Sequence, residues 1–273
     1  MVTFTVSEKE NGRRLDRVIR ERYPEVGRDL LFKLLRKKDI RVNGNRTGEN
    51  ILLFCNDRVS VYVKLARHYR VIYENSNLLV VSKEQGIPVQ SDGNLECSLL
   101  EEIRADFGEN CKLCHRIDRN TGGIVVFAKN SETEAQWLRR FREGQVQKYY
   151  SCIVQGKMPE QEAIEAAWLF KDNKKSRVYI YGEKRTGARP IRTGYRVERY
   201  DSENNVSYLR VRLYTGRTHQ IRAHLAYLGH PIVGDGKYGV LDTKRGLGLR
   251  FQALWASEIE TELFFLKDPP RFR

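Results

Sequence analysis

The chain has 273 residues and carries 49 Lys and Arg against 35 Asp and Glu, which gives a net charge of +14. Hydrophobic residues make up 40%, the mean hydropathy is −0.58, and no apolar run approaches the ~20 residues that a membrane-spanning helix needs. Length and composition therefore predict a soluble globular protein with one sizeable core and room for a small module. The excess of cations indicates a polyanionic partner, because neutralising phosphates releases counterions.

The N-terminus and the cysteines predict a reducing compartment. The first eight residues lack the charged and apolar regions of a signal peptide, so we expect a cytoplasmic protein. The five cysteines are an odd number, which favours free, buried thiols over disulfides. Cys111-Lys112-Leu113-Cys114-His115 fits the C-x-x-C-H pattern of haem attachment, but that chemistry needs export, and zinc needs a second ligand pair of matching spacing. We expect neither haem nor zinc.

Residues 1 to 64 are predicted to form a separate module. Leu15, Val18 and Ile19 share one face of a helix, and a second helical pattern follows with leucines at 30, 31, 34 and 35. The pair Asn43-Gly44 then predicts a two-residue hairpin, because both residues accept positive φ. A strand at 58–63 closes the unit.

Residues 65 to 273 are predicted to form a second domain in which strands outnumber helices. The strands are expected at 71–73, 78–82, 124–128, 149–154, 194–200, 206–214 and 251–260. One helix is expected to begin at Ser131 in a capping box with Glu134 and to bury residues 135, 138 and 141. A second should begin near Thr218 and stop at Gly229. Short polar turns between strands favour an α+β fold with a mixed, largely antiparallel sheet and flanking helices.

The most informative segment is His115-Arg116-Ile117-Asp118-Arg119-Asn120-Thr121-Gly122-Gly123. It places one carboxylate among cations on a polar turn, just before the apolar run 124–127. Opposite charge favours the ionised form of a carboxylate, which suits a nucleophile or base. On charge alone, an Asp that merely pairs with its neighbours to close a turn is the favoured interpretation.

The rest of the chain favours chemistry, because this segment resembles the catalytic motif of the RluA-type pseudouridine synthases. Three further segments resemble that family in the expected order: residues 79–89, with a Lys-x-x-Gly turn at Lys83; Lys148-Tyr149-Tyr150; and residues 216–224 followed by 229–235. Four motifs in order are specific. The resemblance implies a bisected sheet and an RNA pseudouridine synthase that converts uridine to pseudouridine without any cofactor or metal.

The resemblance also implies roles for individual residues. Asp118 would act on the ribose, either as the nucleophile at C1′ or as the base for the 2′ proton, paired with Arg222 as a bidentate partner. Tyr150 would stack on the target base. Further substrate contacts are then expected from the remaining residues of these motifs: Arg116, which would fill the space left by the flipped uridine, Arg217, which would bind phosphate, and His115 and Thr121, which would brace the loop.

The N-terminal module resembles an S-four-like RNA-binding domain, whose RNA face would include seven residues: Arg28, Lys33, Arg36, Lys37, Lys38, Arg41 and Asn43. Structured RNA is thus the expected partner, with large-subunit ribosomal RNA favoured over tRNA, and a monomer is expected. Two positions depart from the family pattern: Gly122 stands where many relatives have Ser, and Gln252 where many have His. The alternative function is a non-catalytic RNA-binding or ribosome-assembly factor.

Overall fold

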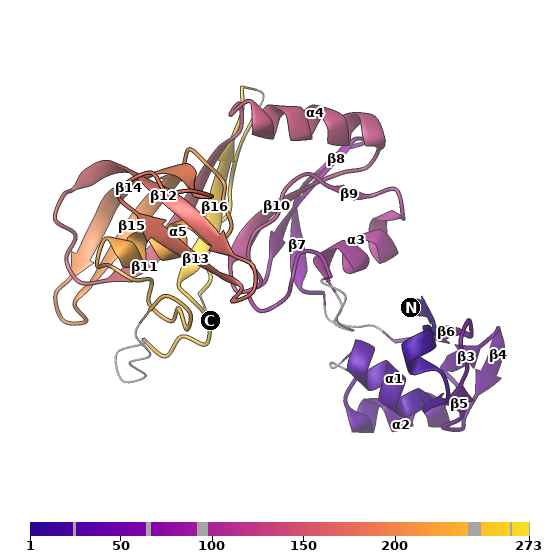
Figure 1. Ribbon diagram of the computed structural model, residues 1–273. Helices are drawn as coiled ribbons and strands as arrows, with labels where there is room; N and C mark the ends of the chain where they lie inside the picture. The colour runs from indigo at the N-terminus through magenta and orange to yellow at the C-terminus, as the bar shows by residue number, and fades with distance from the viewer. Residues whose placement is uncertain (24–25, 64–66, 92–97, 240–246, 263, 273) are drawn as a thin grey trace. The chain divides into compact units, whose positions relative to one another are not determined.

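The computed structural model describes residues 1–23, 26–63, 67–91, 98–239, 247–262 and 264–272 (Figure 1). The chain divides into two compact units, Met1–His68 with Gln90–Glu109, and Tyr69–Val89 with Asn110–Arg273. The expected boundary between 64 and 65 falls outside the described residues. Within the described part, no helix is long and apolar enough to cross a membrane.

In the smaller unit, helices α1 (Leu15–Arg22) and α2 (Arg28–Arg36) pack on a four-stranded antiparallel sheet of order β1-β6-β3-β4, beside a short β2-β5 pair. Its elements are β1 (Val2–Thr5), the 3-10 turn η1 (Glu8–Glu10), β2 (Arg13–Arg14), α1 (Leu15–Arg22), α2 (Arg28–Arg36), β3 (Ile40–Val42), β4 (Asn45–Thr47), β5 (Leu52–Leu53), β6 (Arg58–Val61) and α3 (Leu99–Phe107).

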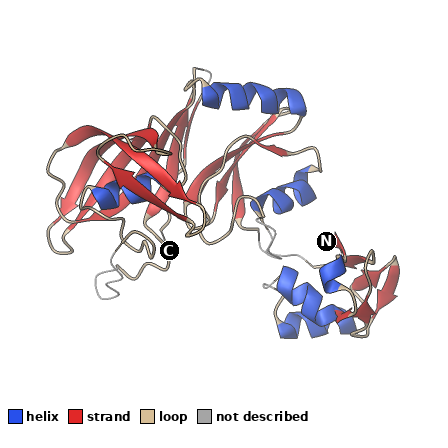
Figure 2. Cartoon of the chain, viewed as in Figure 1, coloured by secondary structure: helices blue, strands red, loops and turns tan. Residues whose placement is uncertain are grey.

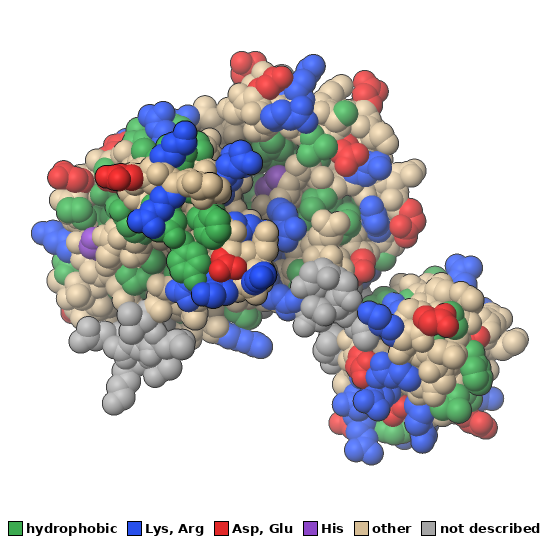
Figure 3. Space-filling model, viewed as in Figure 1, with side chains coloured by type: hydrophobic (Ala, Val, Ile, Leu, Met, Phe, Trp, Pro, Cys, Tyr) green, Lys and Arg blue, Asp and Glu red, His purple; other side chains and the backbone are tan. Residues whose placement is uncertain are grey.

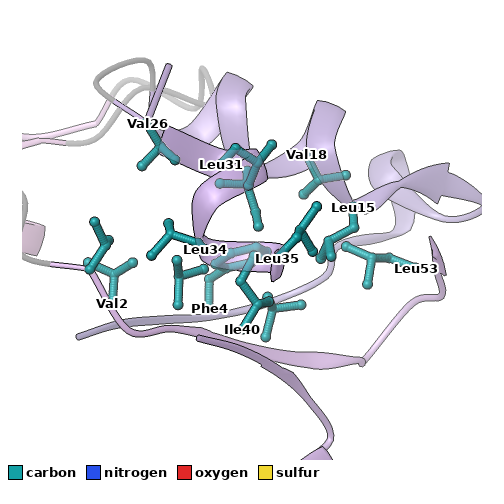
Figure 4. Close-up of a cluster of buried hydrophobic side chains, with 14 of the residues drawn as sticks. Val2, Phe4, Leu15, Val18, Val26, Leu31, Leu34, Leu35, Ile40 and Leu53 are labelled. Carbon is teal, nitrogen blue, oxygen red and sulfur yellow. The ribbon is translucent and has the colours of Figure 1, made fainter. Parts of the chain in front are cut away.

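Periodic leucines explain the core of this unit. Leu15 and Val18 of α1 meet Leu31 and Leu35 of α2 in one buried cluster, which also contains the inward side chains of the sheet (Figure 4). The predicted hairpin is confirmed: Asn43 and Gly44 have φ of 51° and 85° and join β3 to β4. Helix α3 was not predicted, although Ser98 and Glu101 form a capping box at its start.

The larger unit is built on an 11-stranded mixed sheet (Figure 2). Its main path runs β13-β12-β14-β15-β11-β16-β10-β8-β7, with β17 paired to β16 and β9 to β10. The strands are β7 (Tyr69–Glu74), β8 (Leu78–Lys83), β9 (Lys112–Leu113), β10 (Gly122–Ala128), β11 (Gln147–Gln155), β12 (Glu162–Asp172), β13 (Arg177–Tyr181), β14 (Arg189–Asp201), β15 (Val206–Leu213), β16 (Leu254–Glu260) and β17 (Phe265–Lys267). The α+β prediction is confirmed.

The two halves of this sheet join where β10 runs parallel to β16, whereas the pairs β8–β10 and β11–β16 are antiparallel. Gly122 and Gly123 make that junction possible. A Cβ on Gly122 would lie 2.2 Å from the Trp255 ring, and one on Gly123 would lie 2.2 Å from the Ala256 carbonyl oxygen. Gly123 also has φ of +106°, which favours glycine. Glycine at 122, where serine was expected from the family pattern, is thus explained by Trp255.

Both predicted helices of the larger unit form, and the first differs in detail from the prediction. Helix α4 (Ser131–Arg142) is capped by Asn130, which accepts from the Thr133 amide, and not by Ser131. It buries Trp137, while residues 135 and 138 are exposed. Helix α5 (Gln220–Tyr227) begins two residues after Thr218, near the predicted start, and it ends before Gly229 as predicted, where φ is +87°.

Candidate active site

Asp118 lies in the turn that leads into β10, at the junction of the two sheet halves. The turn closes when the Thr121 amide donates to the Asp118 carbonyl at 3.1 Å. The Asp118 side chain keeps 26% of its surface exposed. Among the described residues, its two contacts, a hydrogen bond from Arg222 and the nearby His219 ring, both involve Oδ2, which leaves Oδ1 without a partner. A partly exposed carboxylate held by one oxygen can act on a bound substrate with the other.

Arg222 connects this carboxylate to a second, buried one. Its Nη1 donates to Asp118 Oδ2 at 3.1 Å, whereas Nε and Nη2 donate to Asp235 at 2.7 and 2.9 Å. The pairing of Arg222 with Asp118 occurs as expected, but the bidentate contact is made to Asp235, because only that carboxylate faces the Nε edge of the guanidinium. Burial alone would raise the pKa of Asp235, but the two bonds from Arg222 and the amides of Lys237 and Tyr238 hold it below its usual value.

His219 and Tyr238 complete the surroundings of Asp118. His219 adopts a left-handed backbone conformation with φ of 52°, just before α5, and its Nε2 lies 4.0 Å from Asp118 Oδ2. Its other ring nitrogen, Nδ1, shares a hydrogen bond of 2.9 Å with the Tyr238 hydroxyl. Burial lowers the pKa of His219, although Asp118 opposes this shift. Neutral His219 can therefore orient the Tyr238 hydroxyl without adding a second charge beside Arg222.

Tyr150 faces the Asp118 side of β11, and Tyr149 faces the other side. The register pairs Tyr149 with Arg212 and Tyr150 with Val211, so the two rings alternate as a strand requires. Tyr149 lies 3.7 Å beneath the guanidinium of Arg210. Burial, followed by the charge of Asp118, raises the pKa of Tyr150 well above its usual value. Tyr150 is therefore a neutral, buried ring in the electrostatic field of Asp118.

The backbone of the Asp118 turn is anchored by two long side chains, Lys83 at the end of β8 and Gln85 just after it. Lys83 is fully buried, and its Nζ donates to the carbonyl oxygens of Glu84, Ile87 and Arg119 at 2.8 to 2.9 Å. Burial lowers the pKa of Lys83 to about 7. Gln85 Nε2 donates to the Asn120 carbonyl at 3.0 Å. These bonds fix the turn independently of the Asp118 side chain.

Thr121 and Gln252 hold the far end of the turn. Gln252 is buried and donates from Nε2 to Thr121 Oγ1 at 2.9 Å. The backbone carbonyl oxygen of Gln252 accepts a hydrogen bond from Gln85 Nε2 at 2.8 Å. The glutamine that stands where a histidine was expected thus has a defined structural contact, and it touches the turn rather than Asp118 itself.

His115 lies behind the turn and is not oriented to transfer protons. Its Nε2 accepts a hydrogen bond from the Val126 amide at 3.2 Å, and its ring centroid is 4.8 Å from that of Phe141. Burial, followed by the charge of Lys148, lowers the pKa of His115 to about 3. The imidazole is therefore neutral and serves as an acceptor within the β10 framework.

Arg116 and Arg217 are exposed and flank the turn and the start of α5. Within the described residues, their side chains make no hydrogen bond or ion pair, so both charges are available to a ligand. Figure 3 shows a hollow on the visible face of the larger unit with lysine and arginine side chains at its rim. This distribution suits a strand of nucleic acid, which presents a row of phosphates.

In the smaller unit, four of the expected RNA-binding cations lie on α2, just after it, and on β3. Lys33 and Arg36 are exposed on α2, and Lys37 is exposed just after it. Arg41 of β3 is half-buried, with its guanidinium 5.1 Å from the centre of the Tyr62 ring. Its Nε is buried without a hydrogen-bond partner among the described residues. Three of these four cations are therefore freely accessible to phosphate.

The C-x-x-C-H segment forms no metal centre in the part of the chain that is described, where no group of three or more His, Cys, Asp and Glu could hold an ion. Cys111, Cys114 and Cys152 are buried free thiols, as expected. Cys55 differs, since it is half-exposed and donates to Glu8 at 3.3 Å. Cys97 lies outside the described residues.

Sequence reasoning missed the contributions of Asp235 and Tyr238. Asp235 was included only as the end of the motif at residues 229–235, and Tyr238 had not been singled out. A local signal was present: Asp235 follows Gly234, whose φ is +75°, and accepts from the Lys237 and Tyr238 amides at 2.9 and 3.1 Å. An Asp that caps its own turn in this way fixes the tyrosine three residues later, although spacing alone does not show that both groups reach Arg222 and His219.

Known proteins share the sequence and the fold of this chain. The family model for RNA pseudouridylate synthase matches residues 77–227. The ribosomal large subunit pseudouridine synthase C of Pasteurella multocida is 33% identical over 86% of this chain and 77% of its own length, and that of Haemophilus ducreyi is 32% identical over 86% and 79%. A human RNA pseudouridylate synthase domain-containing protein shares the fold, with a TM-score of 0.63 at 24% identity over 75% of this chain and 84% of its own.

Proposed function

Since the chain belongs to the RNA pseudouridylate synthase family and is an enzyme that isomerises uridine in RNA, we propose that Asp118 is its catalytic carboxylate and that large-subunit ribosomal RNA is its substrate. The carrying observation is the Arg222 bridge, which points one oxygen of Asp118 at Arg222 and leaves the other open.

The reaction breaks the bond between uracil N1 and ribose C1′, forms a bond between uracil C5 and C1′, and releases the proton from C5, while N1 takes up a proton in its place. Atoms and electrons balance within the nucleotide, so no redox or energy-carrying group is required. Asp118 acts on the ribose, and Arg222 keeps the carboxylate oriented through the whole sequence. A bond from a buried guanidinium costs little reorganisation during the reaction, because Asp235 already holds Arg222 in place.

Tyr150 is assigned to contact with the flipped uracil, and Arg116 to the space that the uridine leaves in the RNA stack. The flipped uracil needs an aromatic face and a dry surface, and the buried Tyr150 ring supplies both on the Asp118 side of β11. Arg116 is exposed beside the turn, where a planar guanidinium can occupy the space that the uridine leaves. Arg217 is assigned to a phosphate near the start of α5.

The smaller unit is assigned to RNA binding through Lys33, Arg36, Lys37 and Arg41. The names of the relatives in Pasteurella and Haemophilus support ribosomal RNA of the large subunit as the substrate. Arg41 with its ring partner Tyr62 supports contact with an unpaired base, since arginine and tyrosine both stack on bases. We further propose that the protein acts as a monomer in the cytoplasm, where ribosomal RNA is modified.

Tritium release tests this function. Ribosomal RNA and tRNA carrying tritium at uracil C5 are incubated with wild type and with Asp118→Asn. Release from ribosomal RNA by wild type alone is the expected result. Release by both proteins would remove Asp118 from its role, release from tRNA alone would replace the substrate, and RNA binding without any release would favour the non-catalytic factor.

A further inference from the structure

A groove beside the active site is unused by the mechanism above. It has a volume of about 490 Å³ and is lined by Arg177–Ile180 of β13, by Ala226 and Tyr227 at the end of α5, and by Tyr238. Strand β13 stands at one end of the sheet path and pairs with β12, so its outer edge faces this groove. The volume falls within the range of about 300–1,000 Å³ that small-ligand sites occupy.

Tyr238 forms the wall between the groove and the active site. The Arg222 guanidinium lies 5.3 Å from the ring centre, and the Arg177 guanidinium lies 5.2 Å from it. The hydroxyl accepts from the Val178 amide at 3.0 Å and shares its second bond with His219. A ligand in the groove is therefore one side chain away from the arginine that orients Asp118.

The lining suits a nucleotide. Tyr227 is 52% exposed and Tyr179 is partly exposed, so both can offer an aromatic face to a base. Within the described residues, Arg177 makes no ion pair. Lys237 lies close enough to Arg177 and Arg222 that, after burial, their charges lower its pKa. Asp235 and Asp118 already compensate Arg222, so Arg177 is the cation beside this tyrosine that a phosphate would pair with.

We propose that this groove binds the nucleotide adjacent to the target uridine, with its base against Tyr227 and its phosphate beside Arg177. The inference rests on the proposed function, because Asp118 fixes where the target ribose sits. The next nucleotide along the chain is joined to that ribose by a single phosphodiester, and the groove is the aromatic and cationic surface that adjoins it. The groove thus recognises the sequence or shape beside the target, not the uracil that reacts.

The test uses Tyr227→Ala and Arg177→Gln in the full chain, with Tyr200→Ala as the matched control. Tyr200 is 38% exposed and has a lysine near its ring, but it lies outside the groove. Loss of a base stack typically weakens binding about fivefold or more. Tyr227→Ala should therefore raise KM for tritiated ribosomal RNA at least about fivefold and leave kcat within about twofold. Arg177→Gln should also reduce the slope of log affinity against log salt by about one.

Outcomes separate this inference from the function on which it rests. If both groove variants match Tyr200→Ala in KM and salt slope, the groove is not an RNA subsite. If wild type releases no tritium, the proposed function fails, and the groove is judged by the anisotropy of fluorescent oligouridylate, where the same variants should bind less tightly than Tyr200→Ala. A change in sedimentation confined to the groove variants would identify the groove as a contact between two copies of the chain and overturn the proposal.

Discussion

Replacing Arg222 by lysine separates the charge of this residue from its geometry. Arg222 donates three charge-assisted hydrogen bonds from one rigid plane, two to Asp235 and one to Asp118. A lysine ammonium is a single point on a flexible stem, so it can pair with only one carboxylate at full strength. The Asp235 side chain is completely buried, whereas the Asp118 side chain is 26% exposed. Because an unpaired charge costs more when it is buried, the lysine ammonium should remain paired with Asp235.

The size of the effect follows from the bond that is lost. A hydrogen bond to a charged group contributes about 1.5–3 kcal/mol. Loss of about 2 kcal/mol of orientation at Asp118, expressed in the transition state, corresponds to a decrease of about 30-fold in kcat/KM at 1.36 kcal/mol per tenfold. Stability should fall by only about 1–2 kcal/mol, because Asp235 keeps a cation and the amides of Lys237 and Tyr238. Arg222→Met should cost about 3–5 kcal/mol, since it leaves a buried charge unpaired.

The assay measures initial rates of tritium release, with urea unfolding to correct for any unfolded fraction. Arg196→Lys is the control, because Arg196 makes an exposed ion pair with Glu162 at 2.9 Å on another part of the same sheet. That variant should change neither rate nor stability by a measurable amount. An Arg222→Lys enzyme within about threefold of wild type would refute the argument that the guanidinium geometry orients Asp118. A rate loss fully accounted for by unfolding would refute it equally.

Three further results are expected. Gly122→Ser should lower the free energy of unfolding by about 1–3 kcal/mol, because its Cβ would overlap the Trp255 ring. Gly236→Ser is the control and should leave that free energy unchanged, because no atom lies within 4 Å of a Cβ at this position. Equal urea midpoints for the two variants would contradict the prediction. Burial holds the pKa of His115 near 3 instead of 6.5, so the unfolded chain binds an extra proton between those values, and stability should fall as pH decreases through that window. His115→Gln should make that decrease shallower in urea titrations at several pH values, and an unchanged profile would count against it. Replacing the exposed cations of the α2 segment by glutamine should reduce the salt slope of RNA binding by about one per phosphate contact, measured by anisotropy against wild type; the three are Lys33, Arg36 and Lys37.

Sequence patterns were sufficient where one local cause decides the structure. Asn43-Gly44 fixes its hairpin through backbone conformation, and Gly229 ends α5 for the same reason. They were insufficient where several causes compete. At the start of α4, both Asn130 and Ser131 can cap, and tertiary packing of Trp137 decides which face is buried. Strands β12 and β13 were not predicted, because their charged and exposed residues obscure the alternation that a half-buried strand shows.

The candidate site shows the same division at finer scale. The motif around Asp118 was sufficient to identify the turn, the neighbouring strand and Arg222 as its partner. It could not show that the guanidinium points its bidentate edge at Asp235, since that depends on how the loop after Ile232 folds beside α5. The motif predicts that Arg222 contacts Asp118. How the three donor nitrogens of Arg222 are divided between Asp118 and Asp235 depends on the tertiary structure.

Backbone anchoring and side-chain orientation are therefore separate devices at Asp118. Lys83 and Gln85 hold the carbonyls of the turn, so they set where the Asp118 backbone lies. Arg222, itself fixed by Asp235, sets where the carboxylate points. Because the two sets share no residue, a change in Lys83 should appear first as lost stability, and a change in Arg222 first as lost turnover. A site built in this way can keep its carboxylate partly exposed to substrate, because the buried ion pair between Arg222 and Asp235 fixes Asp118 through a single hydrogen bond.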